Sequence, residues 1–402
     1  MRWTEVYCAG AWLATTYEDV QACLRDPRLS VARAGTWVNS SGADARAQLH
    51  GLKSILARSL LFTEGKRHRR LRQLLAPGVG RAAIAQLEPF LRHCVDESID
   101  ALEARATRGA SFDFMERFAR PLPLRVISRL LGSDAFERAE LVAAAESIAH
   151  FIGEPTPGIE AARAAQQGAV LLIEHFRQGL ASQRTGVPEH ASVLAGLMDA
   201  HLRERLSARE LLIQCAMMLF AGFETTRNLL GNILHAFLEH PLQWDTVRGR
   251  PERLRGAILE VLRWNSPVRY TARRARETLD IGGARIERGQ LVVAMIAAAN
   301  RDPRRYEKPE EFRVDRAQGM PLSFGWGAHA CIGAELSLME AQLLFARIAE
   351  RLPGLRAAGP AVRWAENPVY CGPQRLEVTI ALGARDRVAS QGEPMPMSLS
   401  GT

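Results

Sequence analysis

The chain has 402 residues, of which 47% are hydrophobic and 24% charged, and its formal net charge is +8. This is an ordinary globular composition, and no run of about 18 apolar residues predicts a membrane span. The first residues lack the basic and apolar segments of a signal peptide, so a cytoplasmic protein is expected. No basic run contains the interleaved aromatic residues of a single-stranded nucleic-acid site. Nucleic acid and membrane are therefore not expected partners.

Helical periodicity accounts for most of the chain. The predicted helices span residues 64–76, 81–106, 116–131, 134–151, 158–183, 207–238, 251–264 and 333–352. Strand signals are few and short, at Trp12–Thr15, Arg269–Arg274, Leu291–Ala294 and Leu376–Ile380. The fold class predicted from these patterns is mainly α with a minor β part. Residues 383–402, rich in Ser, Gly, Pro and Met, are expected to form a flexible tail.

The densest basic cluster of the sequence runs from Lys66 to Arg72. Within it, His68 and Arg72 are four residues apart and therefore share one helix face. Read by itself, this cluster is a solvated helix face.

The best-supported helix is the one over residues 207–238. Ser207 and Glu210 form a capping-box pattern at its start, and Pro241 follows its end. The helix is apolar nearly all round, which predicts burial. Its middle nevertheless carries Ala221-Gly222-Phe223-Glu224-Thr225-Thr226. Because Gly and a buried Glu both cost stability there, the segment is equally compatible with a structural kink and with a functional site.

Glu260 and Arg263 lie three residues apart near the end of a predicted helix. Such a pair is usually a surface ion pair that contributes little to stability. The pair alone therefore indicates no function.

The strongest local signal is Phe324-Gly-Trp-Gly-Ala-His-Ala-Cys331-Ile-Gly333, which leads directly into a helix. The glycines permit a tight loop whose backbone approaches a flat ligand closely. The following helix start places N–H groups and a partial positive charge beside the sulfur, which favours a thiolate. The other five cysteines show no metal-type spacing and are expected to be small buried hydrophobes.

In this order and spacing, these features resemble the cytochrome P-450 family of haem-thiolate enzymes. The cysteine loop matches the family pattern Phe-x-x-Gly-x-x-x-Cys-x-Gly, Glu260 and Arg263 match Glu-x-x-Arg, and Ala221 to Thr225 match the oxygen-binding segment. The resemblance implies one domain over residues 1–382, folded as a triangular helical prism. Haem b would lie between the long central helix and the helix after the cysteine loop.

The resemblance also implies roles for individual residues. Cys331 would be the thiolate ligand of the iron, Glu224 and Thr225 would relay protons, and Glu260 and Arg263 would be structural, with Arg316 as the candidate third member of their network. The other residues expected to contact haem or leave room for dioxygen are His68, Arg72, Ala221, Gly222, Arg273, Phe324, Gly325, His329 and Gly333. The expected substrate pocket includes Met217, Phe220, Val268, Arg269, Val369 and Tyr370, with the loop around residues 31–60.

The implied reaction is hydroxylation or epoxidation of a lipophilic small molecule, in natural-product tailoring or catabolism, by a monomer. Oxidative coupling or desaturation, and a non-catalytic haem protein, stay open as alternatives. No electron-transfer segment is fused to the chain, so a separate ferredoxin or flavodoxin-type partner with its NAD(P)H reductase is expected. Arg67, Arg69 and Arg70 are candidates for its docking face, and Arg269 is either a reader of a substrate carboxylate or a surface residue.

Overall fold

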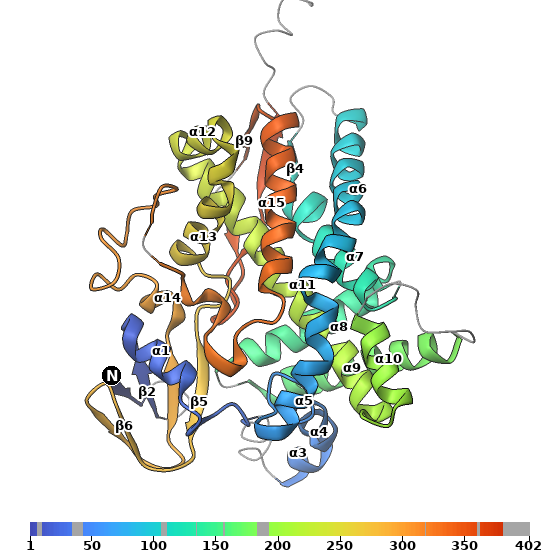
Figure 1. Ribbon diagram of the computed structural model, residues 1–402, viewed down its shortest axis with the longest axis vertical. Coiled ribbons are helices and arrows are strands. Elements are labelled where there is room, and N and C mark those ends of the chain that lie inside the picture. The colour runs from blue at the N-terminus through green and yellow to red at the C-terminus, as the bar shows by residue number, and fades with distance from the viewer. Residues whose placement is uncertain are drawn as a thin grey trace, which may run out of the picture.

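The computed structural model describes residues 1–5, 10–33, 43–105, 111–133, 135–155, 157–182, 193–317, 319–359 and 362–380 (Figure 1). The predicted tail over 383–402 lies outside these residues. The α-helices are α1 (Tyr17–Arg25), α3 (Ala43–Gln48), α4 (His50–Leu56), α5 (Gly65–Leu75), α6 (Arg81–Arg105), α7 (Pro121–Leu130), α8 (Ala139–Gly153), α9 (Ile159–Ser182), α10 (Val193–Leu202), α11 (Ala208–Glu239), α12 (Pro241–Gly249), α13 (Leu254–Trp264), α14 (Ile296–Ala299) and α15 (Ala334–Arg351).

Within the described ranges, the β part consists of four small sheets. The largest has the strand order β1-β2-β8-β5-β3, and the others are β4-β12-β9, β6-β7 and β10-β11. Their bounds are β1 (Arg2–Thr4), β2 (Ala11–Ala14), β3 (Leu29–Ser30), β4 (Ser111–Asp113), β5 (Thr271–Ala275), β6 (Leu279–Ile281), β7 (Ala284–Ile286), β8 (Leu291–Ala294), β9 (Leu355–Ala357), β10 (Arg363–Trp364), β11 (Pro373–Arg375) and β12 (Glu377–Ile380). The predicted fold class, mainly α with a minor β part, is confirmed.

Helix α11 is the central element of the core. The predicted capping box is present, with the Ser207 side chain accepting from the Glu210 N–H, and the helix ends at Glu239, before Pro241. It contacts α7, α8, α9 and α10, and most of its residues are buried. Helix α15 runs beside α6 in Figure 1 and also contacts α13. The cysteine loop, residues 324–333, leads directly into α15. Because α15 packs against α6 and α13, these helices fix the position of the loop.

The eight predicted helices are all found, with ends shifted by a few residues. The helix predicted over 116–131 begins later, because a single π-helical turn, Met115–Ala119, precedes Pro121, where α7 begins. Short helices such as α1 and α12 were not predicted, since they have only nine residues each. No helix within the described ranges combines the length and apolar content that crossing a bilayer requires.

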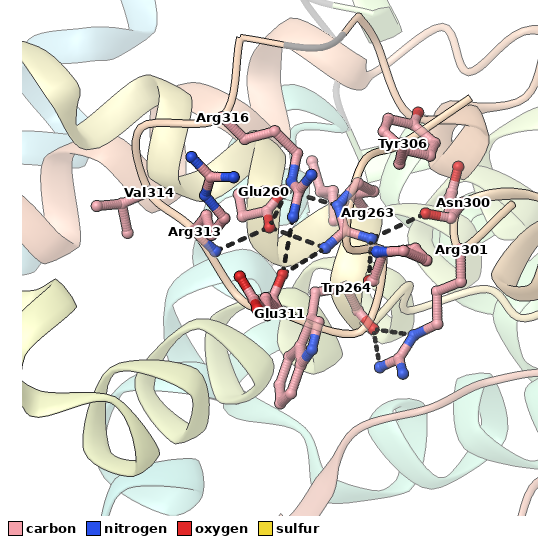
Figure 2. Close-up of polar contacts among 12 residues, drawn as sticks. Glu260, Arg263, Trp264, Asn300, Arg301, Tyr306, Glu311, Arg313, Val314 and Arg316 are labelled. Atoms are coloured by element: carbon pink, nitrogen blue, oxygen red, sulfur yellow. Dashed lines mark hydrogen bonds and ion pairs between the residues drawn. The ribbon is translucent and has the colours of Figure 1, made fainter. Parts of the chain in front are cut away.

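Glu260 and Arg263 are buried, not at the surface as the spacing alone indicates (Figure 2). Arg263 binds Glu260 with both Nε and Nη2, at 2.7 and 2.8 Å. Arg316 Nε donates to Glu260 Oε1 at 3.0 Å, so Arg316 is the third member of the network as expected. The two guanidinium groups also donate to backbone carbonyls in the segment that leads towards the cysteine loop, at Asn300, Glu307, Lys308, Pro309 and Glu311.

Candidate active site

The cysteine loop is a tight turn built around two glycines. Gly325 and Gly327 have φ angles of +71° and +74°, in the left-handed region that other residues rarely adopt. The turn brings Cys331 back to Phe324, and the Cys331 N–H donates to the Phe324 carbonyl at 2.7 Å. The glycines are therefore required by the backbone conformation that presents the sulfur.

The Cys331 side chain faces a cavity and is exposed to it. Burial of the loop among protein atoms raises the pKa of the thiol, while the Gly333 N–H, which donates to the sulfur, and the positive charge of Arg72 lower it. Arg72 also fixes the loop, since its Nη1 donates to the Ala330 carbonyl at 2.8 Å. The contribution of Gly333 is thus made through its backbone N–H, and its own atoms do not line the cavity.

This cavity lies between α11 and the cysteine loop. It is lined by most of the residues that the sequence selects for haem and substrate, namely His68, Arg72, Phe220, Ala221, Thr225, Val268, Arg273, Phe324, Gly325, His329, Cys331 and Tyr370. Residues more than 250 positions apart in the sequence therefore meet at one site, as the pattern predicts.

Four of these residues are basic and are called the basic group below: His68, Arg72, Arg273 and His329. The His68 and His329 rings have centroids 4.1 Å apart. Burial, together with the charges of His68, Arg273 and Arg72, lowers the pKa of His329 to about 4. Burial also lowers the pKa of Arg273, to about 10, which leaves its guanidinium charged at neutral pH. The group therefore offers two fixed cations and two imidazoles to an anionic ligand.

Ala221 and Thr225 of the segment 221–226 in α11 line the cavity. Thr225 lines it and donates from Oγ1 to the Ala221 carbonyl at 2.9 Å. Gly222, expected to leave room for dioxygen beside Ala221, does not line the cavity. A Cβ at position 222 would lie 3.0 Å from Ile127 Cδ1, so the absence of a side chain there serves the packing of α11 against α7.

Glu224 also lies outside this cavity and lines a separate polar pocket, together with Arg120, Glu146 and Arg227. Its Oε1 accepts from Arg227 Nη2 at 2.8 Å and from Asn228 Nδ2 at 3.1 Å. Burial raises the pKa of Glu224, and Arg227 opposes that shift. Glu224 and Thr225 are thus adjacent in sequence but face different pockets.

Three of the expected substrate residues line the cavity and three do not. Phe220 and Tyr370 make an edge-to-face contact at 6.2 Å, and Tyr370 forms a β-bridge with Val268. Met217 and Val369 are buried in the core instead. Arg269 is at the surface, where its Nη2 contacts Cys371 Sγ at 2.9 Å. Of the two interpretations of Arg269, the surface position is the one found.

Val31, Arg33 and Leu60, from the loop expected near the substrate, line the cavity, and several other lining residues were not singled out from the sequence, among them Phe62 and Ile152. Part of the loop expected near the substrate, residues 34–42, lies outside the described residues. Arg33 precedes that part and belongs to the loop around residues 31–60, whereas nothing in the local sequence marks Phe62. Only the tertiary fold brings them beside α11.

The donor set fits the haem that the motif implies. A sulfur stands on one wall of the cavity, cationic side chains stand at its edge, and the described lining includes no Asp or Glu. This set suits a flat metal complex that carries carboxylates, since guanidinium groups bind carboxylates bidentately and a thiolate binds iron. Cys331, the basic group and Phe324 are the residues that would hold it.

The basic cluster of α5 is partly neutralised. Arg67 and Arg70 both bind Glu210, at 3.0 and 2.6 Å, and Arg70 also donates to the Arg205 carbonyl at 2.6 Å. Lys66 and Arg69 are exposed, and no carboxylate pairs with either within the part of the chain that the structure describes.

Comparisons with known proteins agree with this geometry. The profile of the cytochrome P-450 family matches residues 252–352. Cytochrome P-450 107B1 of Saccharopolyspora erythraea is 34% identical, with 92% of this chain and 89% of the relative aligned. Nocardicin C N-oxygenase of Nocardia uniformis subsp. tsuyamanensis is 32% identical, with 93% and 90% aligned. The crystal structure of P450BioI in complex with an acyl carrier protein superimposes with a TM-score of 0.83 at 28% identity, covering 92% of each chain.

The relatives align over nearly their whole length, and the proteins of this family bind haem b through a cysteine thiolate. The range that the family profile matches contains Glu260, Arg263 and the cysteine loop. The chain therefore belongs to the cytochrome P-450 family of haem-thiolate monooxygenases.

Proposed function

We propose that this enzyme inserts an oxygen atom from dioxygen into a lipophilic small molecule, with Cys331 as the ligand of the haem iron. The observation that carries the proposal is the cavity in which Cys331, the basic group and Thr225 converge. His68, Arg72, Arg273 and His329 bind the haem propionates in this proposal. Bound haem supplies the activation of dioxygen, and the cysteine thiolate favours O–O cleavage by donating electron density.

Thr225 and Glu224 have separate parts in this proposal. The Thr225 hydroxyl lies in the cavity. In this proposal its oxygen accepts a hydrogen bond from a bound water molecule, and that water donates the proton to the reacting oxygen. Glu224 holds a proton in the polar pocket on the other side of the helix wall, where Arg227 and Asn228 fix its carboxyl. Proton delivery from the pocket to the cavity then requires the Glu224 side chain or bound water to span the two.

Thr225→Ala removes the hydroxyl that faces the cavity. We expect it to lower the fraction of electrons that reach product by about tenfold or more, with the remainder released as hydrogen peroxide, because positioned acid groups contribute about 10²–10⁴ in rate. Thr226→Ala is the matched control, since Thr226 is buried and bonded to Ser337 at 3.0 Å. NADH consumption, product and peroxide are measured together, and tight coupling in Thr225→Ala contradicts the relay.

The substrate class is proposed from the cavity walls and from the relatives. Phe62, Phe220, Val268 and Tyr370 give the cavity an apolar surface that suits a lipophilic molecule. One relative is named for its action on nocardicin C, and P450BioI was crystallised with an acylated carrier protein. We therefore propose that the enzyme tailors natural products in the cytoplasm. Screening candidate compounds for a spin-state shift of the haem spectrum identifies its ligands.

Two electrons per turnover come from a separate ferredoxin or flavodoxin with its NAD(P)H reductase in this proposal. Its docking face uses Lys66 and Arg69 more than Arg67 and Arg70, whose charges are paired with Glu210. Charge pairing of this kind speeds association at low salt.

We expect the double charge reversal Lys66→Glu, Arg69→Glu to slow ferredoxin-driven reduction about tenfold or more at low ionic strength, and much less at high salt. Arg288→Glu, in the exposed turn after β7, is the control. Stopped-flow reduction under carbon monoxide measures the rate. An unchanged rate in the double variant at low salt contradicts docking at this face.

Oxidative coupling or desaturation without oxygen insertion is the second candidate function, because the same cavity and proton donors serve these reactions. Turnover in labelled dioxygen separates the two. Label in the product supports monooxygenation, and an unlabelled oxidised product supports coupling or desaturation.

A further inference from the structure

Leu60, Leu61 and Phe62 form one wall of the cavity, called the 60–62 wall below. They lie in a run of turns between α4 and α5, and Leu61 is 43% exposed, so the wall reaches from the cavity to solvent. A run of turns has no regular ladder of backbone hydrogen bonds that would fix its position. Side chains of neighbouring elements therefore determine where this wall lies.

One of these side chains is the amide of Gln214 in α11, which is 1% exposed. Its Oε1 accepts from the Leu60 N–H at 2.9 Å, and its Nε2 donates to the Arg58 carbonyl at 2.9 Å. The Nε2 also donates to the Glu210 carbonyl of its own helix at 3.3 Å. Because a single amide pairs with both a donor and an acceptor of the segment, it fixes the distance and the orientation of the chain that enters the wall.

The position of Gln214 on α11 relates the wall to the reacting end of the cavity. Gln214 lies seven residues before Ala221 and eleven before Thr225, about two and three helical turns, so the three residues share one face of the helix. Ala221 and Thr225 line the cavity. The same helix face therefore carries the proposed proton donor and the amide that holds the wall.

The other end of the wall is held by Glu64, which precedes α5. Its carboxylate accepts from the Ser30 hydroxyl at 3.0 Å and from the Val31 N–H at 2.7 Å, and it also pairs with Arg276. Val31 lines the cavity too. Glu64 thus joins two wall segments to each other, whereas Gln214 joins the 60–62 wall to α11.

We propose that Gln214 is a positioning residue that determines substrate specificity, because it fixes the 60–62 wall over α11 and so favours ligands with a long apolar chain. The inference rests on the proposed function and adds a specificity-determining residue to it. Gln214 itself does not line the cavity. Its loss therefore affects the part of a ligand that lies along the wall, and spares a ligand too short to reach it.

The test uses the haem-loaded enzyme and ligands of one chemical type but increasing length. Imidazole, 1-butylimidazole, 1-octylimidazole and 1-dodecylimidazole each bind haem iron through a ring nitrogen, and the shift of the Soret band gives their dissociation constants. Gln214→Leu removes both bonds of the amide. Gln214→Glu keeps an acceptor for the Leu60 N–H and loses the donor to the Arg58 carbonyl.

Gln166→Leu is the matched control, because Gln166 makes the same pair of bonds elsewhere. Its Oε1 accepts from the Leu52 N–H at 2.9 Å, and its Nε2 donates to the Gln48 carbonyl at 2.9 Å. Neither Gln48 nor Leu52 lines the cavity. The control therefore reports the general cost of losing such an amide from the helical core.

We expect the wild type and Gln166→Leu to bind 1-dodecylimidazole at least about 100-fold more tightly than imidazole, because the chain buries apolar surface along the wall. In Gln214→Leu this ratio falls by about tenfold or more, while the imidazole constant stays within about twofold, and Gln214→Glu lies between the two. Hydrogen exchange of the peptide over residues 57–63, which does not depend on haem, becomes faster in Gln214→Leu, since the Leu60 N–H loses its partner.

The proposal is overturned if the length ratio is unchanged in Gln214→Leu, if imidazole is weakened as much as 1-dodecylimidazole, or if the wild type shows no preference for the longer ligands. Unchanged hydrogen exchange over residues 57–63 also overturns it. If neither Gln214 variant retains haem, the amide supports the fold as a whole and the proposal is likewise overturned. Failure of the wild type to give a thiolate-type spectrum instead contradicts the proposed function itself.

Discussion

Cys331→Ala abolishes oxygenation, with product formation reduced by at least about 10³-fold, because no other described side chain in the cavity supplies a thiolate. Haem binding is affected far less, since the basic group and the apolar walls remain. The variant is therefore expected to keep a haem absorption band while losing the spectrum of the thiolate-ligated carbon-monoxide complex. Product assays and the absorption spectrum, measured on the same preparation, check this prediction.

The matched control for that variant is Cys371→Ala. Cys371 is buried and lies outside the cavity, against Arg269 and Asn265. We expect it to retain the thiolate-type spectrum and turnover. Oxygenation that survives in Cys331→Ala, or a spectrum lost equally in both variants, is incompatible with Cys331 as the ligand.

Glu260→Leu removes the carboxylate between two buried guanidinium groups, those of Arg263 and Arg316, whose side chains are 2% and 4% exposed. Breaking a buried ion network leaves uncompensated charge, and the expected loss of unfolding free energy is about 3–5 kcal/mol. Because the network fixes the segment that leads to the cysteine loop, haem content is expected to fall as well. Urea unfolding and the ratio of haem to protein measure the two effects.

Glu335→Leu provides the comparison, because Glu335 pairs with Arg255 at the surface and its side chain is 65% exposed. A surface pair of this kind contributes about 0–1 kcal/mol. Equal stability of the two variants contradicts the bracing role of Glu260.

Much of the fold could be predicted from the sequence because helical periodicity is a local pattern, and the loop that carries the proposed iron ligand is marked by its glycines. Helical periodicity identified α11 and α15, and the glycine positions around Cys331 have the positive φ values that a tight loop requires. The family resemblance supplied the basic residues, which the structure brings to one cavity. It also identified Arg316, whose place in the network no local pattern indicates.

The side chains that escaped prediction depend on the rotation and packing of whole elements. Adjacent residues of α11 point to different surfaces, so Thr225 faces the cavity while Gly222 packs on Ile127 and Glu224 faces a polar pocket. Phe62 and Ile152 line the cavity although no local pattern marks them. Met217 and Val369, expected at the substrate pocket, are buried in the core instead.

The carbon-monoxide difference spectrum of the dithionite-reduced protein tests the central claim most directly, since it reports the ligand of the iron. The account predicts a strongly red-shifted Soret band, the signature of a thiolate from Cys331. A band at the position typical of histidine ligation in freshly purified protein, or no haem signal after reconstitution, contradicts it.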